Sequence, residues 1–132
     1  MSCVFCDIIA RKAPAHILYE DDDMIAFLDR HPIADGHALV LPKRHYERVQ
    51  EIPRHEFIAL LAKVQELSQT ILEKMSAQGA HIAINDGKAA RQLVPHIHVH
   101  IIPRRDDDGV TFTSRKQLRP EQMERIRTLI GT

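Results

Sequence analysis

Three histidines at alternate positions give this chain its greatest capacity for chemistry. Residues 96–102 read His-Ile-His-Val-His-Ile-Ile. Because side chains on a β-strand alternate between its two faces, His96, His98 and His100 are expected to share one face, and the apolar residues between them to point into a core. The β-branched residues favour a strand, and Pro103 is expected to end it or to place it at a sheet edge.

The residues alone leave three uses open for this row of imidazoles. The row can bind a metal ion, it can supply a nucleophile with two helpers, or it can be a polar outer face that is rich in histidine. A neutral imidazole attacks phosphorus well and leaves well, which suits a two-step transfer through a phosphohistidine. His98 is central, so the flanking imidazoles lie close enough to assist it, and we expect it to be the nucleophile.

The rest of the chain supplies the elements that position this row. Apolar residues recur every three or four positions between Pro53 and Met75, which predicts an amphipathic helix of about six turns. Strands are expected at 16–20, 24–28, 38–41 and 81–85, with the histidine row as the fifth strand, a short helix or turn at 4–9 and a last helix opened by Pro120. This order predicts an α+β fold with a five-stranded antiparallel sheet, one long helix and short terminal helices.

Size and charge restrict the class of protein. At 132 residues the chain is long enough for one domain with a single core. Its 18 basic and 18 acidic residues balance, so neither nucleic acid nor a membrane is expected as a partner. No apolar run approaches the roughly 18 residues that a membrane span needs, and no secretory signal is readable. A cytoplasmic enzyme or binding domain is therefore expected, with its two cysteines kept as thiols in a reducing compartment.

The histidine row and four other motifs resemble the histidine-triad superfamily of nucleotide hydrolases and transferases, in particular its small single-domain bacterial members. The other motifs are Cys-Val-Phe-Cys at 3–6, Phe-Leu-Asp at 27–29, Gly-His-Ala-Leu-Val-Leu-Pro-Lys at 36–43 and Asn-Asp-Gly at 85–87. The resemblance covers residues 3 to about 104. It implies a histidine-triad domain over 1–104, a tail over 105–132 whose helix packs on the same domain or on a dimer partner, and a homodimer.

The resemblance assigns catalytic roles to four histidines. In this family the middle histidine, here His98, attacks the α-phosphorus of a nucleotide and releases the other half, and water then attacks the nucleotidylated imidazole. The carbonyl of His96 is implied to accept the other ring N–H of the nucleophile and so to fix its tautomer. His100 matches the histidine that contacts phosphate, and His37 matches a fourth, distal histidine. From the residues alone, His37 can equally be a structural histidine at the end of a loop.

The same resemblance implies a nucleotide-binding set. Asp29 matches an acid that holds the ribose hydroxyls, which suits an acceptor-only carboxylate, although a turn residue after a strand is the simpler interpretation. Asn85 lies at the position of an amide that donates to phosphate or ribose. The apolar residues that match the base-binding positions, with ordinary core as the alternative, are Val4, Phe5, Ile8 and Phe27.

One segment departs from the family pattern. Members often carry Gly-Gln-Ser/Thr-Val just before the triad, whereas this chain has Arg-Gln-Leu-Val at 91–94. The hydroxyl is lost at Leu93, whose backbone N–H can still donate to phosphate. Gln92 is retained and is expected to contact the leaving side, and Arg91 adds charge near a polyphosphate. The identity of the leaving group therefore stays open.

Cys3 and Cys6 form a Cys-x-x-Cys motif with two interpretations. A redox motif usually opens a helix that follows a strand, and nothing precedes this pair. A zinc site needs two more ligands, and histidine-triad relatives with this pair resemble a pattern in which His45 and His96 complete it. Such a Cys₂His₂ set is closed and structural. Two free thiols are the alternative.

These observations predict a dimeric enzyme that hydrolyses nucleotidyl P–N or P–O–P bonds at an α-phosphate. The expected substrates are purine nucleotides: dinucleoside polyphosphates or nucleoside phosphoramidates. Two alternatives remain, namely a phosphorylase or nucleotidyltransferase with an acceptor other than water, and a purine-nucleotide-binding regulatory module with residual turnover.

Overall fold

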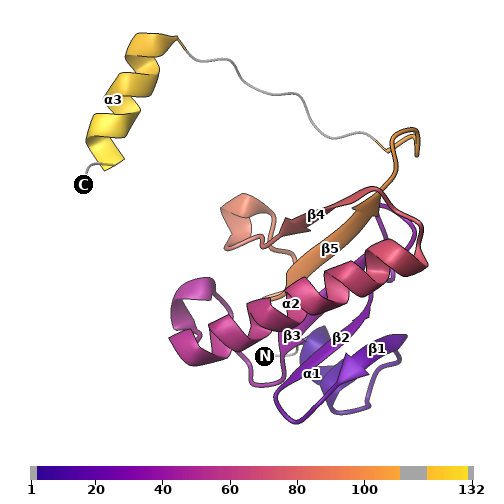
Figure 1. Cartoon of the computed structure of the whole chain (residues 1–132). Coiled ribbons are helices and arrows are strands. Elements are labelled where there is room, and N and C mark those ends of the chain that lie inside the picture. Colours follow the sequence, from indigo (N-terminus) through magenta and orange to yellow (C-terminus); the bar gives the residue numbers. More distant parts are fainter. Residues whose placement is uncertain (1–2, 111–118, 131–132) are drawn as a thin grey trace.

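The computed structural model describes residues 3–110 and 119–130, and it contains one antiparallel sheet with three α-helices in these ranges. The strands are β1 (Ile17–Glu20), β2 (Met24–Leu28), β3 (Ala38–Pro42), β4 (Gly79–Ala83) and β5 (Val99–Arg104). The helices are α1 (Val4–Ile9), α2 (Arg54–Lys74) and α3 (Pro120–Ile130), with short 3-10 turns η1 (Val49–Glu51) and η2 (Lys88–Ala90). The strand order is β1-β2-β3-β5-β4 (Figure 1). The predicted α+β class with five antiparallel strands is confirmed.

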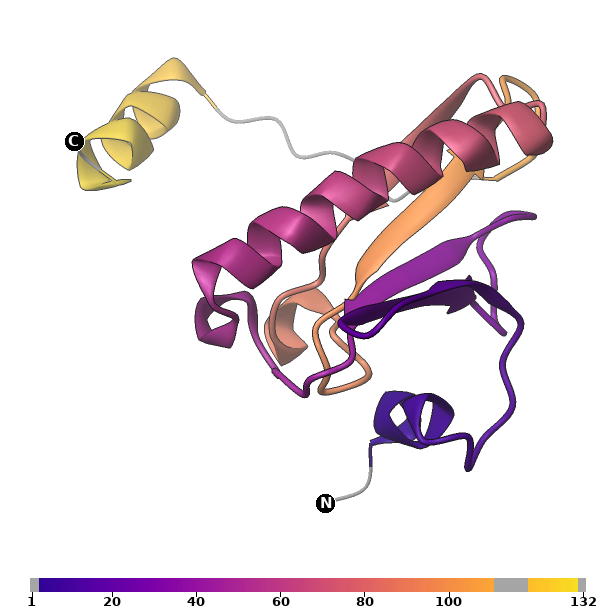
Figure 2. The same cartoon turned by 60° about the horizontal axis from the view of Figure 1, so that its bottom comes forward.

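Both faces of the sheet are covered, which explains why β2 and β3 are apolar at nearly every position. Helix α2 lies across one face and α1 lies under the other (Figure 2). The α2 side of the core contains Leu60, Val64 and Ile71 of the helix, packed on alternate residues of the strands. The α1 side contains Phe5 and Ile8, packed on the other residues of β2 and β3. The long predicted helix is confirmed over 54–74.

The histidine row is less regular than the sequence predicts. Ile97, Val99 and Ile101 do share the α2-side core, as expected. Strand β5 begins only at Val99, however, so the predicted strand is wrong over 96–98. The physical reason is that the backbone N–H of Ile97 donates to the carbonyl of Tyr46 at 2.7 Å, and so takes no part in the sheet ladder.

Two further boundaries differ from the predictions. Strand β4 runs from Gly79 to Ala83, two residues before the predicted 81–85. Strand β5 continues through Pro103 to Arg104. Pro103 pairs with Ala80 of β4 and lies beyond Ile101, the last residue of β5 that pairs with β3. Its missing N–H therefore removes no bond to β3.

Helix α3 confirms the helix predicted after Pro120. Ile126 and Leu129 are 42% and 85% exposed. The packing of the tail on the domain or on a partner stays a prediction. No helix in the described part of the chain is long and apolar enough to cross a bilayer.

Gly87 lies in the turn before the histidine row, where there is little space for a larger side chain. Its φ is +96°, and a Cβ at this position would lie 2.9 Å from Cζ of Arg48, whose guanidinium is bonded to Asp86. We expect Gly87→Ala to lower the free energy of unfolding by about 1–2 kcal/mol, because it adds backbone strain and displaces that guanidinium.

Gly79→Ala in β4 is the matched control, because a Cβ there has open space and the φ is not in the left-handed region. Urea unfolding of the two variants checks the prediction. Equal stability of the two variants would show that neither the positive φ of Gly87 nor its contact with Arg48 constrains this turn.

Candidate functional site

His98 is a buried imidazole with one defined tautomer. Its Nδ1 lies 2.7 Å from the backbone carbonyl of His96. Because a carbonyl only accepts, Nδ1 carries the proton and Nε2 keeps its lone pair. Burial lowers the pKa of His98, which keeps the ring neutral, and the ring of Phe5 contacts it edge-on with centroids 5.0 Å apart. The arrangement provides an oriented, uncharged nitrogen nucleophile.

A hydrogen-bond chain fixes the tautomers of His37 and His100. The backbone N–H of Ile33 donates to Nδ1 of His37 at 3.0 Å, so the proton of His37 is on Nε2. That Nε2 donates to Nδ1 of His100 at 2.9 Å, which places the proton of His100 on its own Nε2. This N–H is buried and has no hydrogen-bond partner among the described residues. The rings of His98 and His100 lie 4.9 Å apart, so a spare donor sits beside the nucleophile.

Burial also sets the charge of the two imidazoles in this hydrogen-bond chain. It lowers the pKa of His100 to about 4, with further lowering by His98 and His37. It lowers the pKa of His37 as well, against an opposing effect of Asp29. His100 is therefore a neutral donor near pH 7.

Asp29 lies beside the same hydrogen-bond chain, next to His37. One carboxylate oxygen accepts the backbone N–H of His31 at 2.9 Å, and the other lies 3.5 Å from Nε2 of His37. Asp29, His37 and His100 are close enough together to hold a metal. The tautomers argue against such a site, because Nε2 of His37 carries a proton and Nδ1 of His100 accepts it. This group is better described as a hydrogen-bond chain from Ile33 through His37 to His100, with the carboxylate of Asp29 beside His37.

Cys3, Cys6, His45 and His96 converge on a second point. Cys6 Sγ lies 3.3 Å from His45 Nδ1, both sulfurs lie 3.6 Å from His96 Nδ1, and the two Nδ1 atoms are 3.1 Å apart. Tetrahedral zinc with its usual bond lengths holds sulfur and nitrogen ligands about 3.3–3.8 Å from one another, so the sulfur–nitrogen distances match and the two nitrogens lie slightly closer together. The donor set and its spacing therefore fit zinc.

Hydrogen bonds prepare His96 for this role. Its Nε2–H donates to the carbonyl of Pro42 at 2.7 Å, so the lone pair of Nδ1 faces the cysteines. Burial lowers the pKa of His96 to about 4, which keeps the ring neutral. Burial and the neighbouring Cys3 raise the pKa of Cys6 to about 11, so the site favours a cation that would offset thiolate charge. His98 belongs to neither converging group of the described residues, so the structure does not support one metal held by the whole histidine row.

The predicted base-binding residues are mostly core. Phe5, Ile8 and Phe27 are buried, and the rings of Phe5 and Phe27 pack edge to face at 5.5 Å. Val4 is 41% exposed and is the member of this set most open to a ligand. Asn85 is partly buried at the start of the turn that contains Gly87. Contact of these residues with a base or ribose stays a prediction.

Gln92 is hydrogen-bonded within the turn, and its contact with the leaving side of a substrate stays a prediction. Its amide oxygen accepts the N–H of Gly87 at 2.7 Å, and its amide nitrogen donates to the carbonyls of Glu47 and Val94. Both amide hydrogens are used, so Gln92 fixes the turn in this structure. Leu93 is 90% exposed, and its backbone N–H stays a candidate donor.

Sequence reasoning missed the role of Asp86. This carboxylate accepts hydrogen bonds from Arg48 Nε, the backbone N–H of Val49 and the side chain of Gln50, at 2.9–3.1 Å. Arg48 and these donors lower the pKa of Asp86 to about 2. The Asn-Asp-Gly motif was a usable signal, but its partners lie far away in the sequence.

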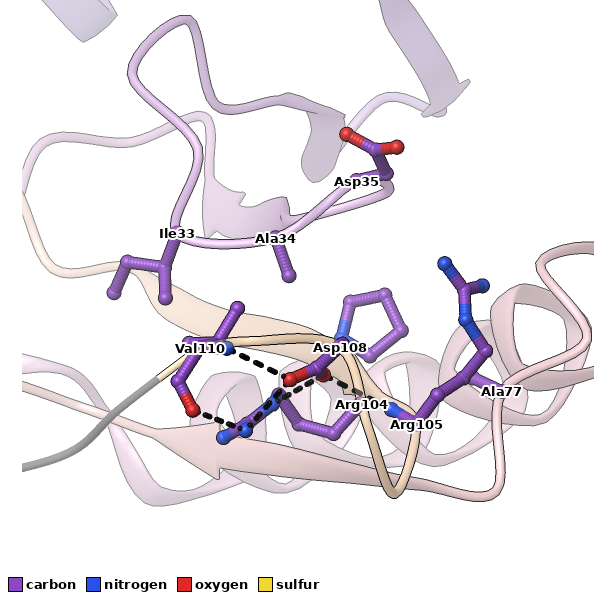
Figure 3. Close-up of a pocket in the computed structure, with 9 residues that line it drawn as sticks. Ile33, Ala34, Asp35, Ala77, Arg104, Arg105, Asp108 and Val110 are labelled. Atoms are coloured by element: carbon purple, nitrogen blue, oxygen red, sulfur yellow. Dashed lines mark hydrogen bonds and ion pairs between the residues drawn. The ribbon is translucent and has the colours of Figure 1, made fainter.

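A separate cavity of about 220 Å³ lies at the other end of β5 (Figure 3). Its lining residues are Ile33, Ala34, Asp35, Ala77, Pro103, Arg104, Arg105, Asp108 and Val110. Arg104 donates to both carboxylate oxygens of Asp108 and to the carbonyl of Val110. No histidine of the row lines this cavity, and its main charges already neutralise each other, so the chemistry lies elsewhere.

Comparison with known proteins agrees with the geometry. The model of the HIT domain family matches residues 10–107. An uncharacterised HIT-like protein of Methanocaldococcus jannaschii is 44% identical over 107 residues, which are 81% of this chain and 82% of that protein. The adenylylsulfatase HINT3 of Arabidopsis thaliana is 40% identical over 80% of this chain and 54% of its own length. The adenosine 5′-monophosphoramidase HNT1 of Saccharomyces cerevisiae is 38% identical over 80% of this chain and 65% of its own length.

Solved structures agree as well. A HIT family protein from Bacillus subtilis superposes with a TM-score of 0.86 at 34% identity, covering 98% of this chain and 95% of that one. A zinc-bound histidine triad family protein from Mycobacterium smegmatis gives 0.80 at 41% identity, covering 95% and 89%. With a family model that spans most of the sheet and relatives of this identity, the chain belongs to the histidine-triad (HIT) domain family.

Proposed function

We propose that this protein cleaves nucleotides at the α-phosphate through a covalent nucleotidyl-His98 intermediate, with water as the final acceptor. One observation carries the proposal: the ring of His98 has a free lone pair on Nε2, and the neighbouring ring of His100 has an Nε2–H without a hydrogen-bond partner among the described residues. The names of two relatives, an adenylylsulfatase and an adenosine 5′-monophosphoramidase, support this class of substrate. Dinucleoside polyphosphates and purine nucleoside phosphoramidates are the proposed substrates.

The proposed reaction has two displacements. Nε2 of His98 attacks the α-phosphorus, the bond from phosphorus to the leaving nitrogen or oxygen breaks, and its electron pair departs with the leaving group. The carbonyl of His96 stabilises the positive charge that develops on the ring of His98 through Nδ1–H. The N–H of His100 donates to the phosphoryl group. Water then attacks phosphorus, loses a proton to solvent and displaces His98, which returns to its neutral tautomer.

The remaining predicted residues have supporting roles in this proposal. Asp29 accepts the ribose hydroxyls, Asn85 donates to phosphate or ribose, and the backbone N–H of Leu93 donates to phosphate. Val4 offers an exposed apolar contact to the base. His37 keeps the tautomer of His100 through its 2.9 Å hydrogen bond.

We also propose a structural zinc ion held by Cys3, Cys6, His45 and His96. All four ligands come from the protein, so the ion has no open position and supplies cross-linking rather than chemistry. It ties α1 to the segment after β3 and to the start of the histidine row. The zinc-bound mycobacterial relative supports this assignment.

The proposed assembly is a cytoplasmic homodimer formed through β4. This strand pairs only with β5 within the described sheet, so its other edge is open. Ile82 of β4 is 52% exposed, and Ile58 and Leu61 of α2 are 61% and 39% exposed. A second copy would bury these side chains. We propose that residues 1–104 form the domain and that the tail over 105–132 is an addition to it.

The first test replaces the nucleophile. His98→Asn cannot form the intermediate, so we expect hydrolysis of adenosine 5′-phosphoramidate to fall about a thousandfold or more while AMP binding changes little. His55→Asn, at an exposed position of α2, is the matched control. Single-turnover rates and calorimetric titration with AMP provide the two readouts. Substantial activity in His98→Asn would refute the assignment.

The second test concerns the metal. Protein purified without chelators should contain about one zinc per chain by mass spectrometry of the metal. The double variant Cys3→Ser, Cys6→Ser should lose the ion and melt at a lower temperature, because a metal bound to the folded state contributes to folding. Gln65→Ser with Gln69→Ser, on the exposed side of α2, is the control pair.

Much of the activity at moderate temperature should survive loss of the metal, since the ion does not contact the substrate in this proposal. A still-folded but inactive variant would instead indicate a catalytic metal. Metal-free wild-type protein would leave the cysteines as ordinary thiols.

The third test uses pH. The pKa of His100 falls from 6.5 in an unfolded chain to about 4 in the folded protein. The unfolded chain therefore takes up the proton first, so this residue lowers the stability of the fold as pH drops from about 6.5 to about 4. The full effect is on the order of 3 kcal/mol.

His100→Gln cannot titrate, and its free energy of unfolding should depend less steeply on pH in this window than that of the wild type. Urea unfolding at several pH values measures the two slopes. Identical slopes would mean that His100 is not held neutral by burial.

A further inference from the structure

Arg91 has a backbone conformation that does not suit its residue type. It ends the η2 turn with φ 68° and ψ 33°, in the left-handed region, and its N–H donates to the carbonyl of Lys88 at 3.0 Å. Glycine adopts this conformation without steric conflict, whereas an arginine is strained there. The turn itself therefore gives no reason for a long cationic side chain at this position.

The turn is held in a fixed place, so the backbone of Arg91 has a defined position. Asp86 on one side bonds Arg48 and the N–H of Val49, and Gln92 on the other side bonds Gly87, Glu47 and Val94 through its amide. These contacts join the turn to η1 and to the segment that leads into the histidine row.

The turn is also joined to the segment that leads to the nucleophile, because Gln92 Nε2 and the backbone N–H of His96 both donate to the carbonyl of Val94. Val94 packs against the apolar cluster that contains Phe5, and the ring of Phe5 contacts that of His98. Arg91 is three residues before Val94, so their Cα atoms are at most about 11 Å apart. The side chain of Arg91 is exposed on a turn that leads directly into the nucleophile segment, which makes it available to an anion that leaves from phosphorus.

The charges around this position favour an anion. Lys88 and Arg91 are both exposed, and neither forms an ion pair within the described residues. The carboxylate of Asp86 is already bonded to Arg48. Leu93 offers no hydroxyl, and Asp29, beside His37, is a carboxylate. The cations that can bind a departing anion are therefore those of the η2 turn, Lys88 and Arg91.

We infer that Arg91 determines specificity by binding an anionic leaving group, a phosphate or sulfate joined to the α-phosphorus through oxygen, in preference to a neutral amine. This inference rests on the proposed function. As Nε2 of His98 bonds to phosphorus, the P–O bond breaks and its electron pair stays on the leaving oxygen. The guanidinium compensates that charge by a charge-assisted hydrogen bond. When an amine leaves, it takes up a proton from solvent and carries no negative charge, so Arg91 contributes little.

The test compares three substrates that share the AMP group: diadenosine triphosphate, adenosine 5′-phosphosulfate and adenosine 5′-phosphoramidate. In Arg91→Gln we expect kcat/KM to fall about tenfold for the first two and to stay within about twofold for the third. Arg91→Lys, which keeps the charge, should retain most of the activity on the anionic pair. Lys74→Gln, which removes an exposed cation at the far end of α2, is the control and should change none of the three values.

Arg91→Gly separates the side chain from the backbone. It should lose the same preference as Arg91→Gln while melting at a temperature equal to or above that of the wild type, because the strain is relieved. A loss in only one of the two anionic substrates would identify that anion, phosphate or sulfate, as the one bound.

An equal loss on all three substrates, or no loss on any, would overturn the inference and leave the proposed function standing. Wild-type protein that cleaves none of the three would overturn the proposed function itself.

Discussion

His96 connects the two chemical parts of this molecule, and the arrangement of both depends on it. Its backbone carbonyl accepts the Nδ1–H of His98, and its side chain lies between the carbonyl of Pro42 and the two cysteines. One residue therefore sets the tautomer of the candidate nucleophile and completes the candidate zinc site. A displacement of His96 would disturb both, which is a strong reason for its complete burial.

The sheet provides the rigidity that this residue requires. Strand β5 pairs with β3 on one side and β4 on the other, and apolar layers cover both faces of the sheet. Burial in turn lowers the pKa values of His37, His98 and His100 and keeps all three rings neutral. The lone pair of His98 and the spare N–H of His100 are preserved in this way. The same packing that stabilises the fold thus prepares the site for attack on phosphorus.

Local patterns predicted the elements that are governed by local physics. The three- and four-residue period gave α2, and the run of apolar residues gave β2 and β3. Two-residue alternation placed Ile97, Val99 and Ile101 in one core layer, even though β5 begins only at Val99. The resemblance of short motifs was enough to name the residues that the structure brings together as the two histidine clusters.

The errors have a common cause, which is that the deciding partner is distant in sequence. The start of β5 depends on the carbonyl of Tyr46. The importance of Asp86 becomes visible only with Arg48 beside it. No periodicity or spacing within the histidine segment contains this information, so only the folded structure could supply it.

The central claim is that cleavage proceeds by two displacements through His98, and the stereochemical course at phosphorus tests it most directly. A substrate with a chiral, isotopically labelled α-phosphorothioate would be hydrolysed in labelled water, and the configuration of the product would be determined by phosphorus NMR. Two in-line displacements each invert the centre, so the account predicts net retention. Net inversion would mean that water attacks the substrate directly, and it would contradict the proposed role of His98.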